Sequence, residues 1–177
     1  ISLWKDKHPN ANIGLCLGAA SKCIAFDIDT EDPKITLILE TLLPKSPSGK
    51  RGAKGITWFY KFDGQESKVL KYRGQQFADF LSTGRQTVIP PSIHPNNNEP
   101  YVWVGKPVYE CLDELPSIDN DTILKILVSI NSLEIDVSDK KKFSEGRNDV
   151  HKIYVIQKID KMSENDIALA LVERDSK

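Results

Sequence analysis

Two aspartates one residue apart close an apolar run near the start of the chain. The run, at residues 23–26, leads directly into Asp27-Ile28-Asp29. Alternate side chains of a strand share a face, so Asp27 and Asp29 would project together while the residues between them pack into a core. Two such carboxylates would repel each other by about 1–3 kcal/mol at an effective dielectric constant of about 20, and a cation between them would relieve this. Oxygen ligands suit Mg²⁺ or Mn²⁺ with substrate phosphates, but the pattern equally allows one aspartate to cap the next helix and the other to face solvent.

A third carboxylate and a histidine are further candidates for chemistry. Asp79 alternates with Phe77 and Leu81 in a predicted strand, where a charge is costly unless it is paired or metal-bound. His94 follows Pro90 and Pro91, so a rigid turn fixes its direction. Most single histidines are structural hydrogen-bonding residues, and this turn makes His94 a somewhat better candidate than most.

Residues 45–55 form a segment of small residues with four cations. The cations are Lys45, Lys50, Arg51 and Lys54. We expect this segment to be a mobile loop, and two interpretations are open. It is a solvated linker, or it is an arm that closes over phosphates, with glycines that expose backbone N–H groups.

The surrounding pattern predicts short strands followed by helices. Strands are expected at residues 13–18, 24–29, 56–62, 67–72, 77–81, from 87 into the turn, and 101–104. The first two should pair as an antiparallel hairpin. A helix is expected from Pro33 up to Pro44, and a second amphipathic helix at residues 121–130.

The composition excludes several classes of protein. At 177 residues the chain is one domain, or one domain with a short appendage. A net charge of −1 provides no general attraction for nucleic acid or membrane, so any polyanion site must be local. Three cysteines, Cys16, Cys23 and Cys111, lack CxxC spacing and are expected to be reduced, mostly buried thiols of an intracellular protein. No apolar run is long enough to span a bilayer, and the start at Ile1 suggests a piece of a longer polypeptide.

The order of these motifs resembles the bifunctional primase/polymerase (Prim-Pol) domain of the archaeo-eukaryotic primase superfamily. The resemblance covers roughly residues 1–135 and is carried by five segments, Asn12-Ile-Gly-Leu15, Phe26-Asp-Ile-Asp29, Ala78-Asp79-Phe80, Val88-Ile-Pro-Pro-Ser-Ile-His94 and Tyr101-Val-Trp103. Residues 143–148 and the two predicted helices after them resemble the start of a primase C-terminal helical module. We therefore expect a catalytic domain at residues 1–136 and a small helical module at residues 143–177.

The resemblance implies an α+β fold, with an archaeo-eukaryotic primase-like core whose RRM-like antiparallel or mixed sheet is flanked by helices. It also implies that Asp27, Asp29 and Asp79 hold Mg²⁺ or Mn²⁺ for nucleotidyl transfer, with nucleoside triphosphates and single-stranded DNA as substrates. A fused or associated helicase, a phage, plasmid or other mobile-element origin and a location in the host cytoplasm or nucleoid are expected as well.

One position departs from the resemblance. The family ordinarily places a phosphate-contacting histidine on the strand after the glycine-rich segment, where this chain has Thr57. A threonine hydroxyl can bind a phosphate but brings no charge. Triphosphate binding is then expected from Lys50, Arg51, Lys54, Thr57, Arg85 and His94, and nucleic-acid contacts from Lys71 and Arg73.

Three hypotheses follow for the function. The first is a template-directed primase or DNA polymerase. The second is a nucleic-acid-binding replication module with weakened catalysis, motivated by Thr57. The third is a glycosyltransferase that uses Asp-x-Asp to hold Mn²⁺ and a nucleotide sugar, which would require a longer parallel βαβ sheet than these short hairpins provide.

Overall fold

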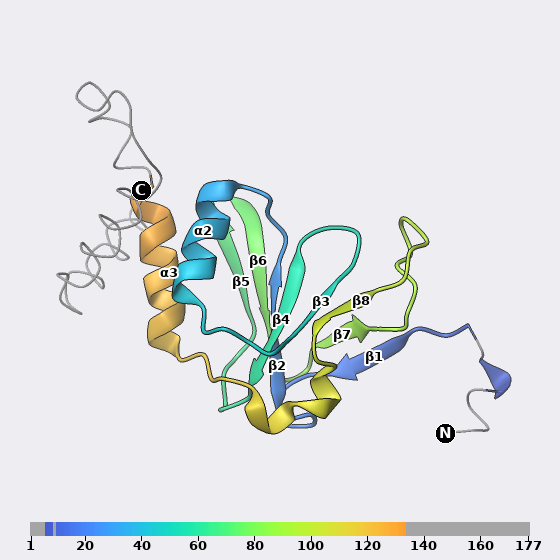
Figure 1. Cartoon of the computed structure of the whole chain (residues 1–177). Coiled ribbons are helices and arrows are strands. Elements are labelled where there is room, and N and C mark those ends of the chain that lie inside the picture. Colours follow the sequence, from blue (N-terminus) through green and yellow to red (C-terminus); the bar gives the residue numbers. More distant parts are fainter. Residues whose placement is uncertain (1–5, 9, 134–177) are drawn as a thin grey trace. The chain divides into compact units, whose positions relative to one another are not determined.

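The structure, a computed structural model, describes residues 6–8 and 10–133 (Figure 1). Its contacts divide the chain into two units. The first unit comprises residues 1–32 and 43–120 and contains all the named strands. The second comprises residues 33–42 and 121–177. Together the described residues form an α+β fold.

The first unit is built on a six-stranded sheet in the order β5-β6-β2-β4-β3-β8. Its strands are β2 (Cys23–Ile28), β3 (Ser48–Arg51), β4 (Ile56–Lys61), β5 (Lys68–Tyr72), β6 (Gln75–Leu81) and β8 (Val102–Gly105). Each neighbouring pair is antiparallel. Two further strands, β1 (Ile13–Cys16) and β7 (Gln86–Ile89), pair antiparallel in a separate small sheet.

The apolar run predicted to be a buried strand is the central strand β2. Cys23, Ile24, Ala25 and Phe26 are all fully buried. On one face, Ala25 and Phe59 join a core cluster with residues of the chain after β8, among them Val108 from the 3₁₀ helix η1 (Val108–Glu110), Cys111 and Leu115 beside η2 (Leu112–Glu114). Apolar burial at this end of the strand anchors β2 and leaves its polar end, at Asp27, free for other contacts.

The second unit contains two described helices, α2 (Pro33–Leu42) and α3 (Asn120–Ser132), the latter starting one residue before the unit boundary. Each buries a mainly aliphatic stripe at helical spacing. The buried residues are Ile35, Ile38 and Leu39 in α2 and Ile123, Ile126, Ser129 and Ile130 in α3. Both helices were predicted, and they confirm the periodicity of the sequence.

Two sequence predictions are wrong. First, β1 does not form a hairpin with β2; it pairs with β7, and only an isolated bridge between Gly18 and Cys23 links the two segments. The reason is that both edges of β2 are already occupied by β4 and β6, so no hydrogen-bonding edge is left for β1.

Second, residues 45–55 are not a loop throughout. Ser48–Arg51 form β3, which lies between β4 and β8 and buries Ser48 and Lys50. Glycine and serine disfavour strands, but two neighbouring ladders supply the hydrogen bonds that outweigh this weak preference. The middle of the basic segment, with Lys50 and Arg51, is therefore part of the sheet, whereas Lys45 and Lys54 lie outside β3.

Three further predictions concern the C-terminal helical module, the cysteines and membrane-spanning segments. The helical module expected at residues 143–177 lies outside the described residues. Of the cysteines, Cys23 and Cys111 are buried, Cys16 is exposed, and all three are free. Among the helices of the described residues, none is long and apolar enough to cross a membrane.

Candidate active site

One row of directly opposed residues crosses five strands of the sheet. From β8 to β6 the partners are Trp103, Lys50, Thr57, Asp27 and Asp79. Residues directly opposite each other in antiparallel strands project to the same face. Two carboxylates, a hydroxyl and an ammonium group therefore share one polar stripe, with neighbouring members spaced about 4.8 Å apart by the sheet.

Thr57 orients the first carboxylate. Its side chain is 2 % exposed, and its hydroxyl donates to Asp27 Oδ1 at 2.5 Å. The sequence led us to expect this hydroxyl at a phosphate. In the structure its proton is donated to the Asp27 carboxylate. Thr57 thus fixes the rotamer of Asp27.

Asp29 and Asp79 are linked by a side chain that the sequence did not single out. The Gln76 amide Nε2 donates to Asp29 Oδ2 at 3.1 Å and to Asp79 Oδ2 at 2.9 Å, so these two oxygens lie at most about 6 Å apart. A bulge explains why Gln76 was missed. Between the pairs Leu70–Ala78 and Lys71–Gln76, β6 carries one residue more than β5, which breaks the strict alternation of faces.

The turn before β4 packs closely against the backbone at the end of β2. Gly55 has φ +61°, and a Cβ at this position would lie 1.9 Å from the carbonyl oxygen of Ile28. Only glycine permits both this conformation and this approach. The close contact holds the start of β4, and with it Thr57, in register beside the two aspartates of β2.

The carboxylates destabilise one another. Burial, and secondly the charge of Asp27, raises the pKa of Asp29 and the pKa of Asp79, and the donated hydrogen bonds of Gln76 only partly oppose this. Crowded carboxylates with raised pKa values are typical of a site completed by a cation.

This repulsion predicts how metal-free protein responds to a charge-removing substitution. A carboxyl group whose pKa is raised in the folded state stabilises the fold fully below its unfolded pKa, and this contribution is lost as the pH rises through the folded pKa. Asp79→Asn is therefore expected to stabilise metal-free protein at pH 7 by at most about 1 kcal/mol, because solvent screens this partly exposed carboxyl, and by nothing below the unfolded pKa of about 4. Thermal unfolding in EDTA at both pH values measures this, and a less stable variant at pH 7 would contradict it.

Lys50 is the buried cation of the row. Lys50 is only 6 % exposed, and its Nζ lies 4.8 Å from the centroid of the Tyr101 ring. Burial lowers the pKa of Lys50, while the charges of Asp27 and Asp29 act in the opposite direction. Within the part of the chain that the structure describes, this ammonium has no hydrogen bond or ion pair, so its donors remain available to a ligand.

Tyr101 joins Lys50 to His94. The rings of His94 and Tyr101 lie 5.3 Å apart. Gly52 makes room for both, because a Cβ there would lie 2.6 Å from Tyr101 Cε1 and 3.3 Å from His94 Cδ2. Burial and the charge of Asp27 raise the pKa of Tyr101, which places its hydroxyl in the field of the carboxylates. The structure thus brings His94 to Lys50 through a residue that the sequence analysis did not assign to the site.

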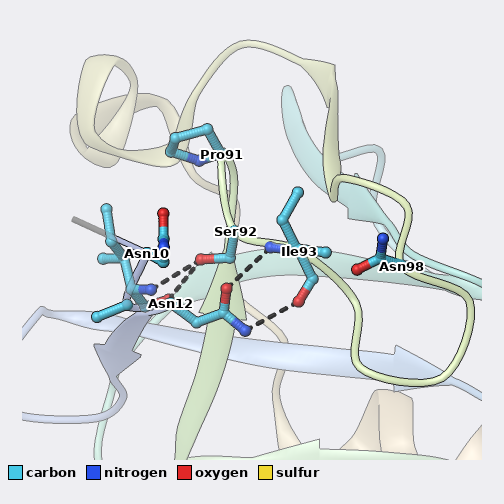
Figure 2. Close-up of a pocket in the computed structure, with 8 residues that line it drawn as sticks. Asn10, Asn12, Pro91, Ser92, Ile93 and Asn98 are labelled. Carbon is cyan, nitrogen blue, oxygen red and sulfur yellow. Dashed lines mark hydrogen bonds between the residues drawn. The ribbon is translucent and has the colours of Figure 1, made fainter. Parts of the chain in front are cut away.

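The turn that carries His94 is tied to the segment before β1. Asn12 donates from Nδ2 to the Ile93 carbonyl at 2.8 Å and accepts from the Ile93 N–H at 2.9 Å, while the Ser92 hydroxyl accepts from the Ile13 N–H at 2.7 Å (Figure 2). These bonds lie at a hollow of about 440 Å³ whose rim includes Asn10 and Asn98. Ser92 and Asn12 therefore have a structural role next to His94.

Loss of the hydrogen bonds between Asn12 and Ile93 should lower the free energy of unfolding. Asn12→Ala removes two hydrogen bonds to the backbone of Ile93 and is expected to cost about 1–2 kcal/mol of unfolding free energy. Urea denaturation measures the difference. Asn96→Ala is the control, because Asn96 is exposed in the tip after His94 and its side chain makes no hydrogen bond within the described residues, and it should cost less than about 0.5 kcal/mol. Equal stabilities for the two variants would contradict a structural role for the hydrogen bonds of Asn12.

The other predicted cations lie in different places. Arg51 follows Lys50 in β3, so its side chain leaves from the opposite face, and Lys54 is exposed in the turn before β4. Arg85 lies on the far side of the carboxylates from Lys50, in a hollow shared with Asp79. Lys71 is exposed on β5, and Arg73, in the β5–β6 turn, lies 5.3 Å from the Tyr72 ring.

Asp27, Asp29 and Asp79 do not form a preformed metal-binding site in this structure. Among the described residues, no group of three or more His, Cys, Asp or Glu side chains is arranged to hold a metal ion. Two of the candidates are instead held by the Gln76 amide and the third by Thr57. The donor chemistry nevertheless fits a hard divalent cation, because all the candidate ligands are carboxylate oxygens and their mutual repulsion favours a positive charge.

Comparison with known protein families gives one match. The family model described as bifunctional DNA primase/polymerase, N-terminal, matches residues 1–118, which include all the strands and the whole row. Searches of curated proteins and of solved structures gave no significant match. Because the family model covers about two thirds of the sequence, the chain belongs to the family of bifunctional DNA primase/polymerase N-terminal domains.

Proposed function

We propose that this chain is a template-directed nucleotidyltransferase, a primase or DNA polymerase, whose reaction takes place over Asp27, Asp29 and Asp79. The family implies primase/polymerase activity with nucleotides and DNA as substrates. In the reaction, the 3′-hydroxyl oxygen of a primer bonds to the α-phosphorus of a nucleoside triphosphate, the α–β anhydride bond breaks, pyrophosphate leaves, and the hydroxyl proton passes to solvent. The observation that carries the proposal is the pairing of Asp27 with Asp79 across two strands, with a buried lysine on the same face.

The carboxylates would act as metal ligands. Bound Mg²⁺ or Mn²⁺ would neutralise developing charge and increase the acidity of the primer hydroxyl. Asp27 is already oriented by Thr57, whereas Asp29 and Asp79 must release the Gln76 amide to turn toward a cation. Gln76 would therefore stabilise the carboxylates until metal and nucleotide arrive together.

Lys50 would bind the triphosphate. It is buried, it faces the carboxylates, and its donors have no protein acceptor among the described residues. A triphosphate would supply several anionic oxygens to this ammonium. With His94 placed beside it through Tyr101, Lys50 would provide the charge that Thr57 lacks.

A second candidate function is a nucleic-acid-binding replication module with little or no turnover. Its specific support is that Thr57 and Gln76 already occupy the carboxylates with hydrogen bonds, and no preformed metal cluster is found in the described part of the chain. The glycosyltransferase hypothesis loses its basis, because every pairing between the named strands is antiparallel and such enzymes need a parallel sheet.

The finer expectations remain parts of this proposal. They are an archaeo-eukaryotic primase-like core with a catalytic domain at residues 1–136, a helical module at 143–177, a mobile-element origin, a helicase partner and a location in the cytoplasm or nucleoid of the host. They rest on the sequence resemblance, and each concerns properties beyond the described sheet.

Primer extension and de novo dinucleotide synthesis on a single-stranded template test the proposal. The full chain should give template-dependent product with Mg²⁺ or Mn²⁺ and none in EDTA. Template binding without product under either metal would instead support the non-catalytic module. A rise in the melting temperature with UDP-sugar and Mn²⁺ would support the glycosyltransferase hypothesis.

A further inference from the structure

We infer that a hollow beside Asp79 binds the sugar–phosphate backbone of the DNA strand that supplies the reacting hydroxyl. This inference rests on the proposed function and assigns a partner to one side of the same site. The hollow has a volume of about 160 Å³, and the residues that line it include Lys68, Val69, Gln76, Asp79, Leu81 and Arg85.

Arg85 supplies a guanidinium group to the hollow. Its backbone is fixed, because its N–H donates to the Ser82 carbonyl at 3.0 Å and its carbonyl accepts from the Leu17 N–H at 2.9 Å. Its side chain is exposed and forms no salt bridge within the described residues. A guanidinium on a fixed backbone, near Asp79 but without a salt bridge to it, suits a phosphodiester oxygen.

The hollow opens at the edge of the sheet. β5 pairs only with β6, so nothing in the six-stranded sheet continues beyond it. Lys71 lies opposite Gln76 on this edge and is exposed, which extends the positive charge along β5. Lys68 also lines the hollow, and its ammonium lies 3.4 Å from Asn120 Oδ1. An open, positively charged edge suits a polymer that must continue beyond the site.

The geometry of the reaction separates the two substrates. In nucleotidyl transfer the attacking hydroxyl and the leaving pyrophosphate lie on opposite sides of the reacting phosphorus. The carboxylates are likewise flanked on two sides, by Lys50 toward β3 and by Arg85 toward β5. The enclosed Lys50 side suits a compact triphosphate, and the open Arg85 side suits the strand that brings the hydroxyl.

Paired substitutions test this division in the full chain. Arg85→Ala should weaken the affinity for a fluorescein-labelled primer–template about tenfold, reduce the slope of log Kd against log salt by about 1, and leave the KM for nucleotide within about twofold. Arg85→Lys should recover most of the affinity. Lys61→Ala is the control, because this exposed cation lies on the same face at the other end of β4, opposite Cys23.

The readouts distinguish this inference from the proposed function. If wild-type protein makes no product, the proposed function fails, and fluorescence anisotropy alone then decides whether Arg85 binds DNA. If wild-type protein is active, a raised nucleotide KM in Arg85→Ala with unchanged DNA affinity would overturn the inference. Equal losses in both parameters, or a loss no larger than that of Lys61→Ala, would also overturn it.

Discussion

Asp27→Asn is expected to reduce template-dependent synthesis by at least about 1,000-fold. Removing one member of a charge-stabilising constellation costs factors of this size, because the compensation of transition-state charge is lost while substrate binding is largely kept. Asparagine has the shape of aspartate and retains an oxygen that can accept from Thr57, so the fold should survive. Initial rates of primer extension at saturating Mg²⁺ or Mn²⁺ measure the effect.

Asp113→Asn is the matched control for this substitution. Asp113 is exposed in η2, outside the sheet that carries the row of site residues, and its loss should change the rate by less than about twofold. The circular dichroism and melting temperature of both variants should confirm that they are folded. If Asp27→Asn keeps more than about a tenth of wild-type activity, the assignment of the metal site to this strand is wrong.

Lys50→Met is expected to have the second largest effect. Methionine fills a similar buried volume without the charge, so the change should raise the KM for nucleoside triphosphate and lower kcat/KM by about 10- to 100-fold. The reason is that Lys50 is the buried cation beside the carboxylates and no other cation replaces it on β3, since Arg51 leaves from the other face. Steady-state kinetics with varied nucleotide measure this.

A neighbouring lysine offers the control. Lys54→Met removes the same charge from an exposed turn four residues away and should change kcat/KM by less than about threefold. Tyr101→Phe should retain activity, because the ring under Lys50 remains, whereas Tyr101→Leu should raise the nucleotide KM in the same direction as Lys50→Met. Equal kinetics for Lys50→Met and Lys54→Met would show that the triphosphate binds elsewhere.

Several features of the site could be read directly from neighbouring residues. The apolar run ending in Asp27-Ile28-Asp29, the aromatic strand after Gly55, and helices α2 and α3 depend on local periodicity, and the structure contains all of them. The alternation of faces along residues 56–62 likewise puts Thr57 on the face opposite to Ile56 and Trp58, and the register with β2 sets it beside Asp27. These features were predictable because a strand's faces and a helix's stripe are fixed by local backbone geometry.

Other features of the fold and the site depended on which segments pair or pack together in the tertiary structure. The segment with Lys50 has the composition of a loop, and only the ladders of β4 and β8 make it a strand. The partner of β1 was decided by the occupation of both edges of β2. Gln76 entered the site through a bulge, and Tyr101 through a close approach that Gly52 allows.

The sequence by itself thus determined the carboxylates, their strand and the family resemblance. The tertiary structure alone decided that Lys50 is the buried cation, that Thr57 serves Asp27, and that Arg85 lies on the other side of the carboxylates. The physical reason is that local sequence fixes the direction of a side chain within its own element, whereas its neighbours are fixed by hydrogen-bond registers between segments far apart in the chain.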